Sequence, residues 1–204
     1  MVKKNKNKII IKIIIAILLW SIFWFSGQAL FFINLDLPFL NFVQNFDKNI
    51  IMLVYTLWVL FVSLIALIIY RWKINDFSFL KIKNKKILWL YIIPLVFAII
   101  IIINGSPFGY NRYLNVFAMT TTTFLAQDVL TFGFLQTYLE KLINPIYAFF
   151  VTSTVFFSAH LAYDLSYYTL ILVFGALLFG FLRYKTKNID LLNIIHTSFL
   201  LIPI

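Results

Sequence analysis

Three ionisable residues, Asp128, His160 and His196, lie inside stretches of this sequence that are apolar enough to cross a lipid bilayer. His160 and His196 are the only histidines of the chain. An acid or base at the centre of a membrane helix costs about 2.5–3.5 kcal/mol on insertion scales, and such residues are usually functional. We therefore treat these three residues as the candidate functional site.

A carboxylate and an imidazole can together activate a water molecule as general base and general acid. A second imidazole can donate a hydrogen bond to a developing oxyanion. The same residue types could bind Zn²⁺, but catalytic zinc normally takes three protein ligands, and the histidines show no H-E-x-x-H spacing. We therefore predict no metal and no cofactor. The alternative is structural, since each of these side chains could simply hydrogen-bond a neighbouring helix, which is worth about 1 kcal/mol.

The composition predicts a membrane protein. The chain has 204 residues, of which 63% are hydrophobic and 12% are charged, whereas soluble domains are about half apolar and a quarter charged. Cysteine is absent, which excludes disulfides and thiolate metal sites. The net charge of +10 would suit nucleic acid, but positive charges also flank membrane spans. We expect the lipid bilayer as a partner and no nucleic acid.

The hydropathy pattern predicts an all-α bundle of about seven transmembrane spans in a single membrane domain, residues 1–204. The first apolar run follows a lysine-rich start and is too long for a signal peptide, so we expect an uncleaved first span. Gly175 and Gly180 in the sixth span would let another helix approach closely. The predicted spans are 9–33, 50–70, 87–103, 113–139, 145–163, 167–184 and 189–204.

The basic residues predict the direction of the chain in a cell membrane. With the N-terminus in the cytoplasm, all but two of the 17 lysines and arginines fall in cytoplasmic segments, the exceptions being Lys48 and Arg112. Cytoplasmic loops carry an excess of Lys and Arg. We therefore predict a multi-pass protein with a cytoplasmic N-terminus.

The dipeptide Asn144-Pro145 predicts a tight turn between the fourth and fifth spans. Asp128 lies sixteen residues before Asn144, and His160 lies sixteen residues after it. At 1.5 Å per residue, both would lie about 24 Å from the turn and hence at one level of a helical hairpin. His196 lies eight residues after Asn188, about 12 Å from the turn before the last span, so its level matches less well.

Residues 113–204 resemble the CPBP (Abi) family of CAAX proteases and bacteriocin-processing membrane proteins. This family carries E-E-x-x-x-R on one helix, F-x-x-x-H on the next, and a later H-x-x-x-N. Gln127 to Phe132 resembles the first motif, Phe156 to His160 matches the second, and His196 to Leu200 resembles the third. The resemblance implies that Gln127, Asp128, His160 and His196 mark a catalytic site.

Three residues depart from the family pattern. Gln127 stands where the first glutamate is taken to act on the attacking water, and a glutamine side chain cannot serve as a base. Phe132 replaces the arginine, and Leu200 replaces the asparagine, a candidate oxyanion donor. Asn193, three residues before His196 on the same helical face, could take over from that asparagine.

These departures favour a weakened or inactive protease that binds a peptide or another membrane protein, for example as an immunity or scaffold protein. The alternative is an active intramembrane endopeptidase of the CAAX or bacteriocin-processing type. A third reading is a small substrate-binding subunit of a transporter, which the length and the number of spans allow.

Overall fold

The computed structural model describes residues 6–31, 46–81, 85–105, 109, 111–161 and 167–202, with side chains except at 27–31 and 167–171. The described residues form helices and their connections and contain no strand. This confirms the predicted all-α fold. The breaks predicted around residues 34–45, 106–107 and 164–166 lie outside the described residues.

Within the part of the chain that the structure describes, three helical segments are long and apolar enough to cross a membrane. They are Lys6–Ser26 within α1 (Lys6–Phe31), all of α3 (Lys48–Lys73), and Lys85–Asn104, which joins the 3₁₀ helix η2 (Lys85–Tyr91) to α4 (Ile92–Asn104). They correspond to the first three predicted spans. Two later helices are apolar but shorter, α7 (Pro145–Leu161) and α9 (Asp190–Leu201).

The fourth predicted span, 113–139, is one continuous helical segment whose middle is not α-helical. It comprises α5 (Arg112–Thr122), the π-helix η3 (Thr123–Leu135) and α6 (Gln136–Leu142). π-helices are rare, occur mostly as short insertions in α-helices, and are frequent at functional sites. An i→i+5 pattern has more residues per turn than an α-helix and therefore a smaller rise per residue. The assumption of 1.5 Å per residue across 128–135 is wrong for this reason.

The turn at Asn144-Pro145 is confirmed. The Asn144 side chain accepts a hydrogen bond from the backbone N–H of Ile146 at 3.0 Å, and Pro145 is the first residue of α7. Asparagine before a helix and proline at its first position are both favourable, because the asparagine satisfies a free N–H and the proline lacks one.

Helices α7 and α8 (Tyr167–Thr186) pack closely against each other. A Cβ atom added to Gly180 would collide with the Ser153 hydroxyl and with the Phe149 ring. The Ser153 hydroxyl donates to the carbonyl of Ala176 at 2.9 Å. The glycine thus allows the close approach predicted for it, whereas a Cβ at Gly175 would make only an ordinary contact.

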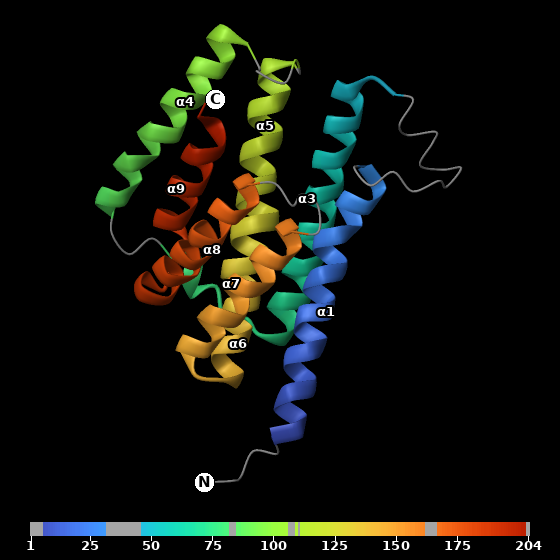
Figure 1. Cartoon of the computed structure of the whole chain (residues 1–204), viewed down its shortest axis with the longest axis vertical. Helices are drawn as coiled ribbons and strands as arrows, with labels where there is room; N and C mark the ends of the chain where they lie inside the picture. The colour runs from blue at the N-terminus through green and yellow to red at the C-terminus, as the bar shows by residue number, and fades with distance from the viewer. Residues whose placement is uncertain are drawn as a thin grey trace.

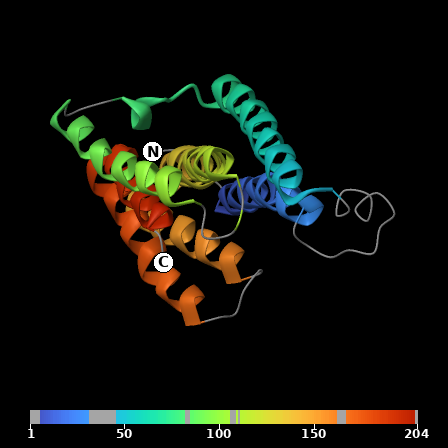
Figure 2. The ribbon, with the colours of Figure 1, turned by 90° about the horizontal axis from the view of Figure 1, so that it is seen from above.

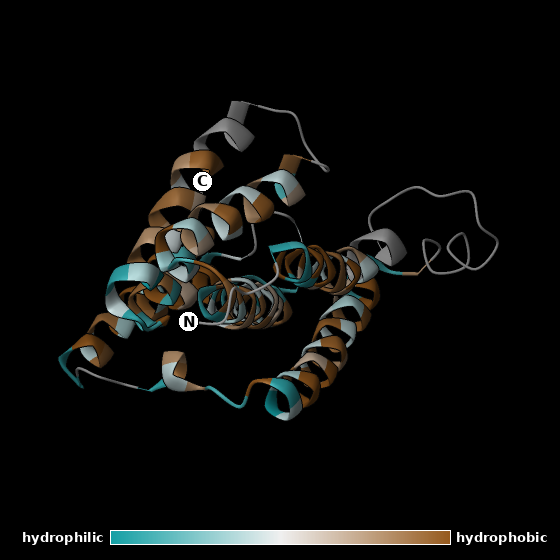
Figure 3. Cartoon of the chain, turned by 90° about the horizontal axis from the view of Figure 1, so that it is seen from below, coloured by the Kyte–Doolittle hydropathy of each residue, from teal (hydrophilic) through white to brown (hydrophobic). Residues whose placement is uncertain are grey.

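The helices run between two ends of the bundle (Figures 1 and 2). At one end, polar groups join segments far apart in the sequence: Lys141 lies 3.2 Å from Asp76, and Lys187 lies 2.9 Å from Glu140. We call this the basic end. Figure 3 shows hydrophilic residues gathered at helix ends and connections, with apolar residues along the helices.

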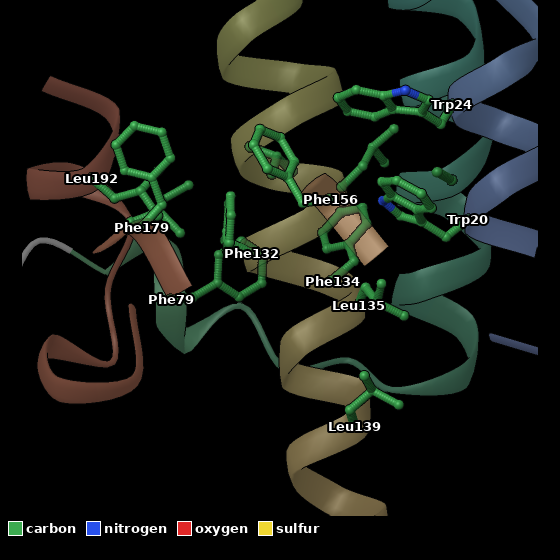
Figure 4. Packing of buried hydrophobic residues seen from close by; sticks show 14 of the residues in the cluster. Trp20, Trp24, Phe79, Phe132, Phe134, Leu135, Leu139, Phe156, Phe179 and Leu192 are labelled. Atoms are coloured by element: carbon green, nitrogen blue, oxygen red, sulfur yellow. The ribbon is translucent and has the colours of Figure 1, made fainter. Parts of the chain in front are cut away.

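An aromatic core surrounds η3 (Figure 4). Phe134 stacks on Tyr70 with ring centroids 4.1 Å apart, and Phe132 contacts Phe156 at 5.1 Å. The short 3₁₀ helix η1 (Ser78–Leu80) inserts Phe79, which is fully buried, against Gly133. The core therefore holds the π-helix between α1 and α3 on one side and α8 and α9 on the other.

Candidate functional site

Asp128 lies at the centre of η3 and is completely buried. Its Oδ1 lies 2.8 Å from Nδ1 of His196, and its Oδ2 accepts a hydrogen bond from the Asn193 amide at 2.7 Å. Both partners come from α9, one helical turn apart. A buried carboxylate is stable only when it is paired and hydrogen-bonded, and here both oxygens have partners.

Two further polar side chains contact the Asn193 amide and hold it in place. Its nitrogen also lies 3.2 Å from the Thr197 hydroxyl, and its oxygen accepts a hydrogen bond from the Tyr91 hydroxyl at 3.2 Å. The amide oxygen accepts from the Tyr91 hydroxyl and the amide nitrogen donates to the Asp128 carboxylate. These two bonds determine which way the amide is turned. The chain from Tyr91 to Asp128 therefore connects η2, α9 and η3.

His196 is buried between aromatic rings. Phe179 lies 4.5 Å away and Phe156 lies 6.0 Å away, between ring centroids. With Asp128 ionised, Nδ1 of His196 carries the hydrogen, and Nε2 of the neutral ring keeps its lone pair. The carboxylate thus fixes the tautomer and the orientation of the imidazole.

His160, at the end of α7, also contacts Phe156. The Phe156 ring lies 4.5 Å from the His160 ring, and Trp24 of α1 lies 5.5 Å from it. Nδ1 of His160 lies 2.9 Å from the carbonyl of Phe156, which can only accept, so Nδ1 is the protonated nitrogen. Nε2 is then free to accept a proton or a hydrogen bond.

The structure therefore brings Asp128 and His196 into direct contact but places no hydrogen bond between Asp128 and His160 among the described residues. The aromatic ring of Phe156 lies between ring contacts to both histidines, at 4.5 Å from His160 and 6.0 Å from His196.

Gln127 lines a small cavity between η3, α1 and α3. The volume of the cavity, about 20 Å³, is enough for one water molecule. The indole N–H of Trp24 and the hydroxyl of Ser63 also line it, and both are buried without a hydrogen-bond partner among the described residues. A water here would have three polar neighbours: the Gln127 amide, Trp24 and Ser63.

A family model described as type II CAAX prenyl endopeptidase Rce1-like matches residues 109–202. This range holds η3, α7 and α9, and with them all of the candidate residues. Over this region, the chain is similar to the CAAX endopeptidase family. Comparisons with curated proteins and with solved structures found no match.

Within this CAAX endopeptidase-like region, Phe132 takes the position expected for arginine and belongs to the core. It is fully buried and contacts Phe156 and Phe179. Leu200, at the position expected for asparagine, is half-buried and has no side-chain donor. Asn193 binds Asp128 instead, which is a different role from donating to an oxyanion.

Sequence reasoning found some members of this site and missed others. The sequence indicated Asn193 as a candidate because it lies three residues before His196. Tyr91, Trp24 and Ser63 come from segments outside the family motifs, and no sequence pattern pointed to them. Among the described residues, no three His, Asp or Glu side chains come together as a metal site would require.

Proposed function

We propose that this CAAX endopeptidase-like membrane protein binds the lipid-attached tail of a peptide or a membrane protein at the site around His160, and hydrolyses it very slowly or not at all. Gln127 carries the proposal. It lines the water-sized cavity on the side of η3 that faces Trp24, and Trp24 contacts His160. A glutamine can hold a water there by hydrogen bonds but cannot take its proton.

The geometry of Asp128 supports the same proposal. Its two oxygens are used by His196 and Asn193, and it is completely buried. A general base must lie within hydrogen-bond reach of the proton that it removes. Asp128 does not line the cavity, so it is a poor substitute for a carboxylate at position 127. We assign it to holding α9 against η3.

The binding function rests on the groups that remain available. His160 presents Nε2 as an acceptor, and Gln127 offers both an amide donor and an acceptor. A peptide backbone inside a membrane must have its polar groups satisfied by such partners. Trp24 supplies an apolar wall beside them.

The second candidate, an active endopeptidase, is favoured by one observation. Because the Phe156 carbonyl fixes His160 as the Nδ1-protonated tautomer, its Nε2 could itself accept a proton from water. This reading needs no carboxylate at position 127.

The two candidates are separated by measuring capture and cleavage of the same peptide. The protein would be reconstituted in liposomes with a prenylated, photoactivatable peptide that carries a fluorophore and a quencher. We expect the wild type to cross-link the peptide, and its turnover to equal that of His160→Ala. Turnover by the wild type that His160→Ala abolishes would support the endopeptidase instead. A peptide that is neither captured nor cut would contradict the proposal.

A further inference from the structure

A groove of about 500 Å³ lies on the other face of α1, bounded by α1, α3 and the segment formed by η3 and α6. Its volume lies within the usual range of ligand sites, about 300–1,000 Å³. Most of its lining is apolar, including Ile15, Leu19, Ala66 and Phe134. It is distinct from the water-sized cavity, although Phe23 and Leu130 line both.

The length of the groove matches one leaflet of a bilayer. Along α1 it extends from Lys12 to Phe23. At 1.5 Å per residue these positions are about 16 Å apart along the helix axis. The hydrocarbon core of a bilayer is about 30 Å thick, so one leaflet contributes about 15 Å. A single acyl chain could therefore lie along the groove over its full length.

One end of the groove is positively charged. Lys12 of α1 and Lys73 at the end of α3 both line it, and neither forms an ion pair with a described residue. The neighbouring Trp72 is 80% exposed, and the Lys73 ammonium lies 4.6 Å from its ring centroid. Exposed tryptophans gather at the headgroup level of membranes, which places Lys73 at that level. The charge therefore lies where a lipid phosphate would be.

Two polar side chains deeper in the groove, Trp20 and Tyr70, already have hydrogen-bond partners. The Trp20 indole N–H donates to the Thr131 hydroxyl at 3.0 Å, and the Tyr70 hydroxyl donates to the carbonyl of Asp76 at 2.8 Å. A peptide lying here would leave its own N–H and C=O groups unpaired, which is costly in an apolar environment. A hydrocarbon chain has no such groups. The lining thus selects an acyl chain over a peptide.

We propose that this groove binds one acyl chain of an anionic phospholipid, with the lipid phosphate between Lys12 and Lys73. This inference is independent of the proposed function, since it involves neither Gln127 nor His160. The bound chain would pack against Trp20, which stacks on Trp24 at 5.0 Å, and so would support the helix that forms one wall of the site.

The test is native mass spectrometry of the intact protein with phosphatidylglycerol and phosphatidylcholine of identical chains. Each lysine near an anionic headgroup contributes about 1 kcal/mol, so we expect the wild type to favour phosphatidylglycerol by roughly thirtyfold. Lys12→Gln with Lys73→Gln should remove this preference. Lys81→Gln with Lys185→Gln makes the same charge change at exposed positions outside the groove and should keep it. Glycerol phosphate, which has no acyl chain, should not displace the lipid.

Three results would overturn the proposal. The first is equal retention of the two lipids by the wild type. The second is an unchanged preference in the Lys12 and Lys73 double variant. The third is displacement of bound phosphatidylglycerol by a prenylated peptide, which would make the groove a peptide site. None of these results would bear on cleavage at His160.

Discussion

At the scale of single residues, two neighbouring side chains have separate tasks. Asp128 points to α9 and is bonded to His196 and Asn193, whereas Gln127 lines the cavity near Trp24. The structure thus divides the motif into a residue that holds the helices together and a residue that faces the proposed peptide site.

The structural task of Asp128 predicts a large loss of stability on its removal. Asp128→Ala leaves Nδ1 of His196 buried without an acceptor, and losing one partner of a buried pair costs about 3–5 kcal/mol. Gln127→Ala is the matched control at the neighbouring position. Because Gln127 has no hydrogen bond among the described residues, we expect a cost of about 1 kcal/mol or less. Thermal unfolding in detergent measures both, and equal losses would contradict the division of tasks.

The core position of Phe132 predicts that the family's arginine cannot simply be restored. Phe132→Arg would bury a cation against the rings of Phe156 and Phe179. We expect aggregation or loss of the folded protein in size-exclusion chromatography, with Phe132→Leu as the folded control. A monodisperse, stable Phe132→Arg protein would show that this part of the core is misassigned.

At the scale of the elements, the helices were largely predictable and the π-helix was not. The predicted span 145–163 corresponds to Pro145–Leu161, and 50–70 corresponds to Lys48–Lys73. These helices could be predicted because apolar runs and the Asn144-Pro145 turn are local features of the sequence. The π-helix depends on contacts from both sides, including Trp20 on Thr131 and Phe79 on Gly133, which no local pattern records.

The candidate site also depends on tertiary contacts that no local sequence pattern records. The hairpin arithmetic placed Asp128 near His160, whereas the described hydrogen bonds of Asp128 go to His196 and Asn193 of α9. The short helix η1 buries Phe79 in the core although basic residues surround it in the sequence. Tyr91 reaches Asn193 only because η2 lies against α9, which is a tertiary contact.

The packing of α7 on α8 gives a prediction with an internal control. Alanine normally stabilises a helix relative to glycine by up to about 1 kcal/mol. Gly175→Ala should therefore be neutral or slightly stabilising. Gly180→Ala must displace Ser153 and Phe149, and overpacking of this kind costs about 1–3 kcal/mol. Unfolding midpoints of the two variants would show the contrast, and equal midpoints would mean that the helices do not meet at Gly180.

At the scale of the whole molecule, the basic end gathers residues from α3, α6 and the turn between α8 and α9. The sequence predicts that this end faces the cytoplasm. The absence of native cysteine allows a direct test with single-cysteine variants. Figure 1 shows the start of α5, the helix that holds Tyr113, at the opposite end of the bundle from α6, which lies at the basic end.

We expect an impermeant maleimide to label Tyr113→Cys in intact cells. Lys81→Cys and Lys185→Cys should react only after the cells are permeabilised. The wild type, which cannot react, is the blank for the measurement. The reverse labelling pattern would place the basic end outside, and labelling of all three variants in intact cells would contradict a fixed membrane orientation.

The central claim is that the molecule has a CAAX endopeptidase-like site in which the missing water-activating carboxylate at position 127 limits cleavage. Its most direct test is the cleavage rate of Gln127→Glu in liposomes with the quenched prenylated peptide. The introduced carboxylate would face the Trp24 indole N–H and the Ser63 hydroxyl, and a general base typically contributes 10²–10⁴-fold. We predict cleavage at least about a hundredfold faster than by the wild type, which His160→Ala abolishes and Gln127→Ala does not reproduce. A folded Gln127→Glu protein that binds the peptide yet cleaves no faster than the wild type would contradict the account.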